Sequence, residues 1–100
     1  MAAYQVAIVK ITNPTLPGFK EYVKKAAELT AKAGATYVVR GPADEVPEGA
    51  MLKGVSVIVT KWPSLEAAKG FYHSAEYQAI VPLRDGSGVY DLGIFPEAPQ

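Results

Sequence analysis

The chain has no cysteine and one histidine, and these shortages exclude several kinds of site. Disulfide bonds, thiolate metal sites and thiol nucleophiles are excluded by the missing cysteine. The single His73 cannot form an all-imidazole metal cage, and no glycine-rich phosphate loop is present. The acidic segment 44–48 lacks the alternating oxygen ligands of a calcium loop. We therefore expect no metal and no cofactor.

The chain also lacks an excess of charge of either sign and a long apolar run. Ten lysines and arginines balance ten acids, so no overall positive field attracts nucleic acid or an anionic membrane surface. No apolar run approaches the roughly 18 residues of a membrane-spanning helix, and the first ten residues resemble a strand more than a signal peptide. We expect cytoplasmic residence, with neither nucleic acid nor membrane as a partner.

What is present is a regular hydrophobic pattern. Residues 4–11 predict a strand that stops at Asn13-Pro14, and apolar positions three and four apart predict a helix from Leu16, with Gly34 just past its end. Further strands are predicted at 36–40, 55–61 and 89–95. Ser64 and Ser74 are typical N-caps and predict two short helices, 65–72 and 75–80, that meet near His73.

The order β-α-β-β-α-β predicts one ferredoxin-like domain over residues 1–95, followed by a C-terminal tail at 96–100. The fold class is α+β, with a four-stranded antiparallel sheet and its helices on one face. The strands are apolar on both faces: Val6 and Ile8 alternate with Ala7 and Val9. Because the helices cover one face only, we expect a second copy of the chain to cover the other and form a homodimer.

Four segments together resemble a known family. They are the strand GATYVVRG (34–41), Trp62-Pro63-Ser64, the helical pair FYHSAEYQAI (71–80) and Pro82-Leu83-Arg84. The chain resembles the domain of unknown function family 1330, within the dimeric α+β barrel superfamily. The resemblance implies two back-to-back sheets and a cleft in each subunit between helices and sheet. It implies no particular activity, since the superfamily includes cofactor-independent monooxygenases, isomerases, haem-degrading enzymes and members without known chemistry.

Two arginines are candidates for holding an anionic ligand. Arg40 ends an apolar strand, where its guanidinium can bind a carboxylate or phosphate through two hydrogen bonds. It can equally form a salt bridge with Asp44, Glu45 or Asp91. Arg84 follows a proline and can fold over the same cleft, or it can be a loop residue bound to local carbonyl groups.

Other candidates carry hydroxyl, imidazole or carboxylate groups. Tyr72 and Tyr77 lie on the short helices and offer phenols that can donate to a ligand oxygen, although aromatic residues on helices also serve as core. Tyr37 can line the cleft or pack. His73 is the one side chain of a type that titrates near neutral pH, but it lies at an exposed joint. Asp91 interrupts the last strand and is a base only if it faces the cleft.

Two functions remain open at this point. The chain is either a binding protein for a small anionic or aromatic metabolite, or a cofactor-independent enzyme, isomerase or monooxygenase-like, that acts on such a compound. The absence of a clear base disfavours the enzyme, whereas the arginines and tyrosines in the matched segments favour a cleft. The sequence does not decide whether the protein is an enzyme.

Overall fold

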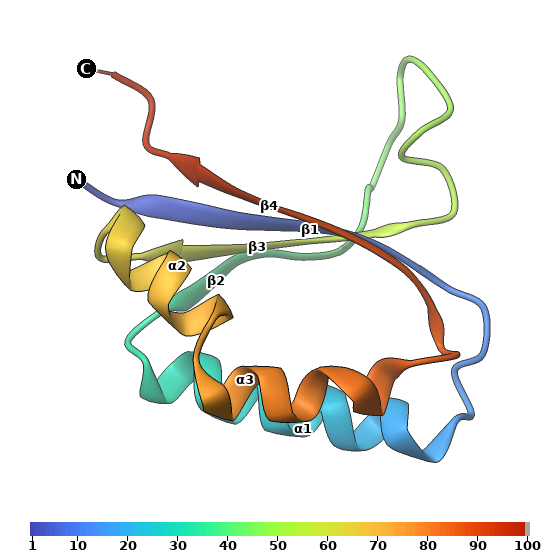
Figure 1. Cartoon of the computed structure of the whole chain (residues 1–100). Helices are drawn as coiled ribbons and strands as arrows, with labels where there is room; N and C mark the ends of the chain where they lie inside the picture. Colours follow the sequence, from blue (N-terminus) through green and yellow to red (C-terminus); the bar gives the residue numbers. More distant parts are fainter. Residues whose placement is uncertain (100) are drawn as a thin grey trace.

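The computed structural model describes residues 1–99, which form a single antiparallel sheet with its helices on one side (Figure 1). The elements in chain order are β1 (Ala3–Ile11), α1 (Pro17–Lys32), β2 (Thr36–Pro42), β3 (Ser56–Trp62), α2 (Leu65–Tyr72), α3 (Ala75–Ile80), the 3-10 helix η1 (Val81–Arg84) and β4 (Gly88–Pro96). The strand order β2-β3-β1-β4 confirms the predicted ferredoxin-like α+β fold.

The register of the sheet decides which side chains face the helices. On the central strand β1, Ala7 pairs with Ile58 on one side and with Leu92 on the other. These three residues line the space beneath the helices. Because side chains alternate along a strand, their neighbours Val6 and Ile8 point to the other face.

The edge strand β2 is irregular, and the irregularity matters for the site. Tyr37 pairs with Thr60 and Arg40 pairs with Ile58, with a register shift between Tyr37 and Val39. Two residues three apart point to opposite faces of a regular strand, whereas this bulge turns both Tyr37 and Arg40 toward the helices. The strand also runs two residues further than expected, through Pro42, since an edge strand tolerates proline.

The helices begin and end largely as predicted. Proline occupies the first position of α1, and Gly34 follows the helix with a φ of 85°, a conformation that suits glycine. The hydroxyls of Ser64 and Ser74 accept hydrogen bonds from backbone amides in the first turns of α2 and α3. The sequence did not predict η1, which continues from α3 through Pro82 to Arg84.

The tightest packing lies at one end of the sheet, under α2. Trp62, which is 2 % exposed, clusters there with small buried residues, and its indole N–H donates to the Thr60 hydroxyl at 2.9 Å. By contrast, the backbone of α1 lies close to α3 and η1 rather than directly against the strands. This difference leaves room between α1 and the sheet.

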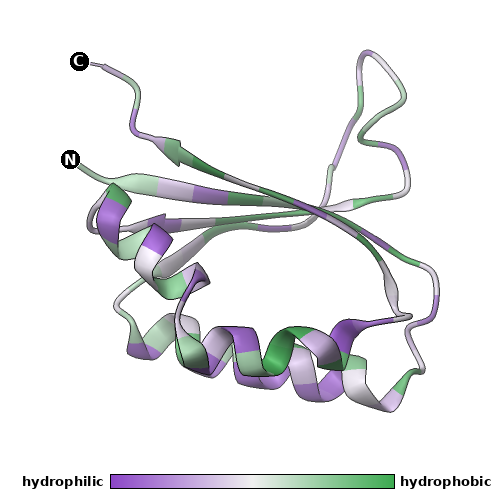
Figure 2. Ribbon diagram, viewed as in Figure 1, coloured by the Kyte–Doolittle hydropathy of each residue, from purple (hydrophilic) through white to green (hydrophobic). Residues whose placement is uncertain are grey.

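The opposite face of the sheet carries no helix in the described part of the chain (Figure 1). We call it the open face; its apolar members by register are Val6, Ile8, Val39, Val57, Val59, Val89 and Phe95. Val89 and Phe95 are 59 % and 52 % exposed, and apolar positions recur along the strands (Figure 2). The loop 43–55 projects past this face, away from the helices.

Across residues 1–99 the helices are too short or too polar to cross a membrane. The expected tail at 96–100 begins as the end of β4, and the Glu97 amide donates to the Ala2 carbonyl at 3.2 Å. Gln100 lies outside the described residues.

Candidate functional site

A cleft of about 400 Å³ lies between the sheet and the helices. Its floor is apolar and includes Ala7, Val9, Ile58 and Leu92, and its roof includes Phe19, Val23 and Ala26 of α1. Among the described residues that line it, the charged ones are all arginines, Arg40 and Arg84. The cleft is therefore an apolar space with positive charge and no lining carboxylate.

One wall of the cleft is a series of aromatic rings, which we call the aromatic row. Trp62 and Phe71 have ring centroids 4.8 Å apart, and Phe71 and Tyr77 are 5.0 Å apart. Tyr22 continues the row 6.3 Å from Tyr77, and Tyr90 lies 6.4 Å from Tyr22. These separations are typical of favourable aromatic pairs. The row connects the core under α2 to the end of the cleft that holds Arg84.

Arg84 lies against two phenol rings. Its Cζ lies 5.3 Å from the Tyr22 ring centroid and 4.3 Å from that of Tyr90, and its Nη1 donates to the Tyr22 hydroxyl at 3.2 Å. Stacking on aromatic rings suits the planar guanidinium. The salt bridge that the structure shows within residues 1–99 joins Glu21 to Lys25, so no carboxylate neutralises Arg84.

Ser87 ties this end of the cleft together and is fully buried. Its carbonyl oxygen accepts hydrogen bonds from the backbone amides of Thr12 and Asn13, at 2.8 and 2.9 Å. Its hydroxyl bonds to the Arg84 carbonyl and lies 2.7 Å from the Tyr90 hydroxyl. The turn after η1 is therefore anchored to the turn after β1, which positions both Arg84 and Tyr90.

Tyr22 and Tyr77 form a close pair of phenols. Their hydroxyl oxygens lie 2.6 Å apart, and Tyr77 is 2 % exposed. Burial raises the pKa of Tyr77 above its ordinary value, and the neighbouring Tyr22 raises that pKa further, although Arg84 opposes the shift. Tyr77 therefore stays a neutral phenol, suited to donate a hydrogen bond and unsuited to accept a proton as a base.

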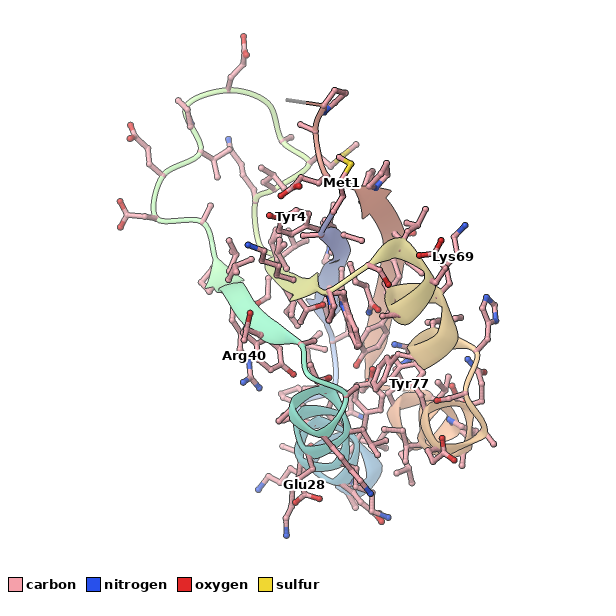
Figure 3. All side chains as sticks on the ribbon, turned by 90° about the vertical axis from the view of Figure 1, so that its left-hand side faces the viewer. Met1, Tyr4, Glu28, Arg40, Lys69 and Tyr77 are labelled. Atoms are coloured by element: carbon pink, nitrogen blue, oxygen red, sulfur yellow. The ribbon has the colours of Figure 1, made fainter. Side chains whose placement is uncertain are left out.

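Arg40 lies at the other side of the cleft, on the edge strand. Its guanidinium carbon is 4.6 Å from the Tyr37 ring centroid, and the residue is exposed. Figure 3 shows Arg40 on β2 beside α1, well apart from Tyr77 on α3. The predicted salt bridges with Asp44, Glu45 or Asp91 are not formed. The two arginines thus lie at opposite sides of the cleft. Arg40 is on β2 and Arg84 lies against Tyr90 of β4, and these two strands are opposite edges of the sheet.

The structure brings four predicted site residues to the cleft: Tyr37, Arg40, Tyr77 and Arg84. The others lie elsewhere. The Tyr72 ring packs 5.5 Å from that of Tyr77, but Tyr72 does not line the cleft. His73 is exposed at the joint between α2 and α3, 5.1 Å from the Tyr72 ring. Asp91 pairs with Ile8 and points to the open face.

Three residues of the Arg84 end were not predicted from the sequence: Tyr22, Ser87 and Tyr90. The spacing of apolar residues in the sequence does indicate that the two tyrosines face the cleft. Tyr22 is three residues after Phe19 on the apolar side of a predicted helix, and Tyr90 must face the helices if Asp91 faces away. Ser87 had no such signal, because it stands in a turn. Among residues 1–99, no group of three or more acids or histidines could hold a metal ion.

Solved structures share the fold at low sequence identity. A protein of unknown function from Rhodopseudomonas palustris, RPA0582, has a TM-score of 0.71 at 14% identity, with 99% of this chain and 84% of that chain covered. SnoaB, a cofactor-independent oxygenase from Streptomyces nogalater, has a TM-score of 0.67 at 11% identity, with coverages of 99% and 95%. A possible oxidoreductase from Bacteroides thetaiotaomicron has a TM-score of 0.60 at 16% identity, with coverages of 96% and 97%.

The sequence comparisons agree with the earlier resemblance. No curated protein sequence matches the chain. The model of one family, described as Domain of unknown function (DUF1330), matches residues 2–98. The chain belongs to the DUF1330 family.

Proposed function

We propose that the protein binds a small aromatic metabolite with a negative charge in the cleft between helices and sheet. The observation that carries this proposal is the composition of the cleft: about 400 Å³ of mainly apolar space, an aromatic row along one wall, and two arginines as the charged lining residues. Small-molecule sites commonly combine an apolar surface with a few well-placed polar groups. The volume suits a compound of one or two rings.

The two ends of such a ligand experience different surroundings. Its ring lies between the apolar floor, around Ala7 and Ile58, and the aromatic row. Its charge lies beside Arg84, which already lies against Tyr22 and Tyr90 and needs little reordering to bind. Arg40 at the exposed edge is free to bind a second polar group of a longer ligand.

The test is a thermal-shift titration with naphthoate, an aromatic carboxylate, and with para-nitroanisole, a neutral aromatic. We expect saturable stabilisation of the wild type by both, since the floor and the aromatic row bind rings. Ala7→Leu fills part of the cleft floor without changing a polar group, and it should abolish both shifts. Arg84→Gln removes the charge beside the ligand's carboxylate and should reduce the naphthoate shift alone. Unchanged shifts in Ala7→Leu would place binding outside the cleft and refute the proposal.

A second candidate is a cofactor-independent enzyme, isomerase or oxygenase-like, on the same class of compound. The observation in its favour is the similarity to SnoaB over nearly the whole chain. Among residues 1–99, those that line the cleft include no carboxylate, histidine or lysine to act as a base. Oxygen uptake, and changes in the spectrum of a bound aromatic substrate, distinguish turnover from binding alone.

We also propose that the open face is covered by a second copy of the chain. The face spans roughly 30 Å along the strands and roughly 19 Å across them, or about 600 Å². That is of the order of the ~800 Å² per partner in a stable interface, and the loop 43–55, with exposed Met51 and Leu52, extends beyond it. Cytoplasmic residence stays a prediction from the sequence.

A further inference from the structure

The Arg84 end of the cleft offers one hydroxyl hydrogen that the protein itself does not use. The Tyr22–Tyr77 pair has two hydroxyl hydrogens, and one of them lies in the bond between the two oxygens. The Tyr22 oxygen also accepts from Arg84. Within the described residues neither hydroxyl has a further acceptor, so the second hydrogen is available to a ligand oxygen beside the Arg84 charge.

The same end has no group that accepts a proton near neutral pH. The titratable and charged side chains that line the cleft, from every element around it, are Tyr22, Tyr37, Arg40, Tyr77, Arg84 and Tyr90. All are tyrosines or arginines, types that are protonated at neutral pH. The cleft can therefore stabilise a negative oxygen, but it has no side chain to generate one. A ligand must bring its own negative charge.

The surroundings of the Arg84 charge favour a planar, delocalised anion. The guanidinium lies against the rings of Tyr22 and Tyr90, and its Nη1 donates to the Tyr22 hydroxyl. The free phenol hydrogen adds an O–H donor beside the remaining guanidinium N–H groups, so one ligand oxygen can accept from both kinds of donor. A phenolate or enolate spreads its charge into a planar system, so its transfer into an apolar cleft costs less than the transfer of a localised charge.

We infer that the Arg84 end of the cleft selects an acidic phenol or enol in its ionised form, held by the Arg84 charge and by the free hydroxyl hydrogen of the Tyr22–Tyr77 pair. This inference rests on the proposed function, because it specifies which anion the aromatic site binds. It adds a property that general aromatic binding does not require: the site discriminates between two protonation states of one ligand.

The experiment uses para-nitrophenol, whose phenol and phenolate forms absorb at different wavelengths. Titrating the ligand's absorbance against pH, with and without excess protein, reports the pKa of the bound ligand directly. We expect that pKa to fall by about one pH unit, which corresponds to about a tenfold preference for the phenolate. Arg84→Gln, and the double variant Tyr22→Phe with Tyr77→Phe, should each remove most of this shift, because the double variant lacks both phenol hydrogens. Tyr72→Phe, which changes a nearby phenol outside the cleft, should leave it unchanged.

The outcomes separate the inference from the proposed function. If para-nitroanisole and naphthoate bind but the pKa of bound para-nitrophenol does not fall, the cleft binds aromatics and the inference is wrong. If the phenolate binds no more tightly than naphthoate in the wild type, the site does not prefer a delocalised anion and the inference is likewise overturned. If none of the three binds, the proposed function itself fails. A lowered pKa that survives in the double variant Tyr22→Phe with Tyr77→Phe would exclude the phenol pair as its cause.

Discussion

At the scale of single residues, the site depends on groups whose roles cannot be exchanged for chemically similar ones. Arg84 has a flat guanidinium, which lies against two phenol rings while its Nη1 donates to the Tyr22 hydroxyl. A lysine at this position would keep the charge, but it would lose the stacking and the fixed direction of the donor. Tyr77 likewise combines a buried ring with a hydroxyl whose partner is another tyrosine.

The pH dependence of stability should reveal the buried phenol of Tyr77. Its ordinary pKa is 10.0, and the folded protein raises that pKa. Above about pH 10 the unfolded chain releases this proton while the folded chain keeps it, so the free energy of unfolding should fall as the pH rises. Below pH 10 both states hold the proton and this contribution is constant.

Urea unfolding of the wild type and of Tyr77→Phe measures this effect. The pH values should run from roughly 8 to 11, a range that includes the ordinary tyrosine pKa. The wild type should lose more stability than Tyr77→Phe over the upper part of the range, because the variant lacks the titrating group. The lysines are the same in both proteins, so their contribution cancels in the difference. Parallel curves would show that Tyr77 ionises as readily in the folded state as in the unfolded one.

At the scale of elements, the helices and strands were largely predictable, whereas the site was only partly so. Alternation and helical spacing are local signals, and they located all four strands and the serine-capped break at His73. The β2 bulge, which turns both Tyr37 and Arg40 toward the cleft, arises from pairing with β3 and has no local signal. The same holds for η1 and Ser87, which are fixed by contacts with distant parts of the chain.

The approach of α1 to η1 explains how Tyr22 reaches Arg84. A Cβ at Gly18, in the first turn of α1, would overlap the Leu83 carbonyl oxygen of η1. Gly18→Ala should therefore push the helix away from η1 and destabilise the protein by about 1–3 kcal/mol, as overpacking commonly does. It should also weaken binding at the Arg84 end, because Tyr22 moves with α1.

Gly70→Ala is the matched control. Gly70 lies in α2 with no atom within 4 Å of an added Cβ, so alanine there should stabilise the protein by about 0.5–1 kcal/mol through its higher helix propensity. Urea midpoints for the two variants measure both effects. The two changes in stability need not be equal in size. A Gly18→Ala variant as stable as the wild type would show that α1 adjusts without strain.

At the scale of the whole molecule, the two faces of the sheet differ in what covers them. The face under the helices forms the cleft, and the open face presents apolar side chains such as Val39, Val89 and Phe95. A surface of this kind is unusual on a monomer. Back-to-back pairing of two open faces leaves both clefts accessible, because each cleft lies on the far side of its own sheet.

Light scattering tests the pairing. The wild type should have the mass of two chains at micromolar concentration, and Val59→Lys, which places a charge near the middle of the open face, should have the mass of one. Ala31→Lys adds the same charge to an exposed position of α1 and should leave the dimer intact. A wild-type mass of one chain would exclude the second copy as the cover of the open face.

The bridge from Ser87 to the turn after β1 also determines when the site can exist during folding. Ser87 and Thr12 are 75 residues apart in the chain, and the central strand β1 gains its second neighbour only when β4 arrives. Contacts between such distant residues form slowly, because a long loop must close first. A nascent chain therefore cannot assemble the guanidinium end of its cleft until its last strand is synthesised, so binding of the proposed ligand would report on complete folding.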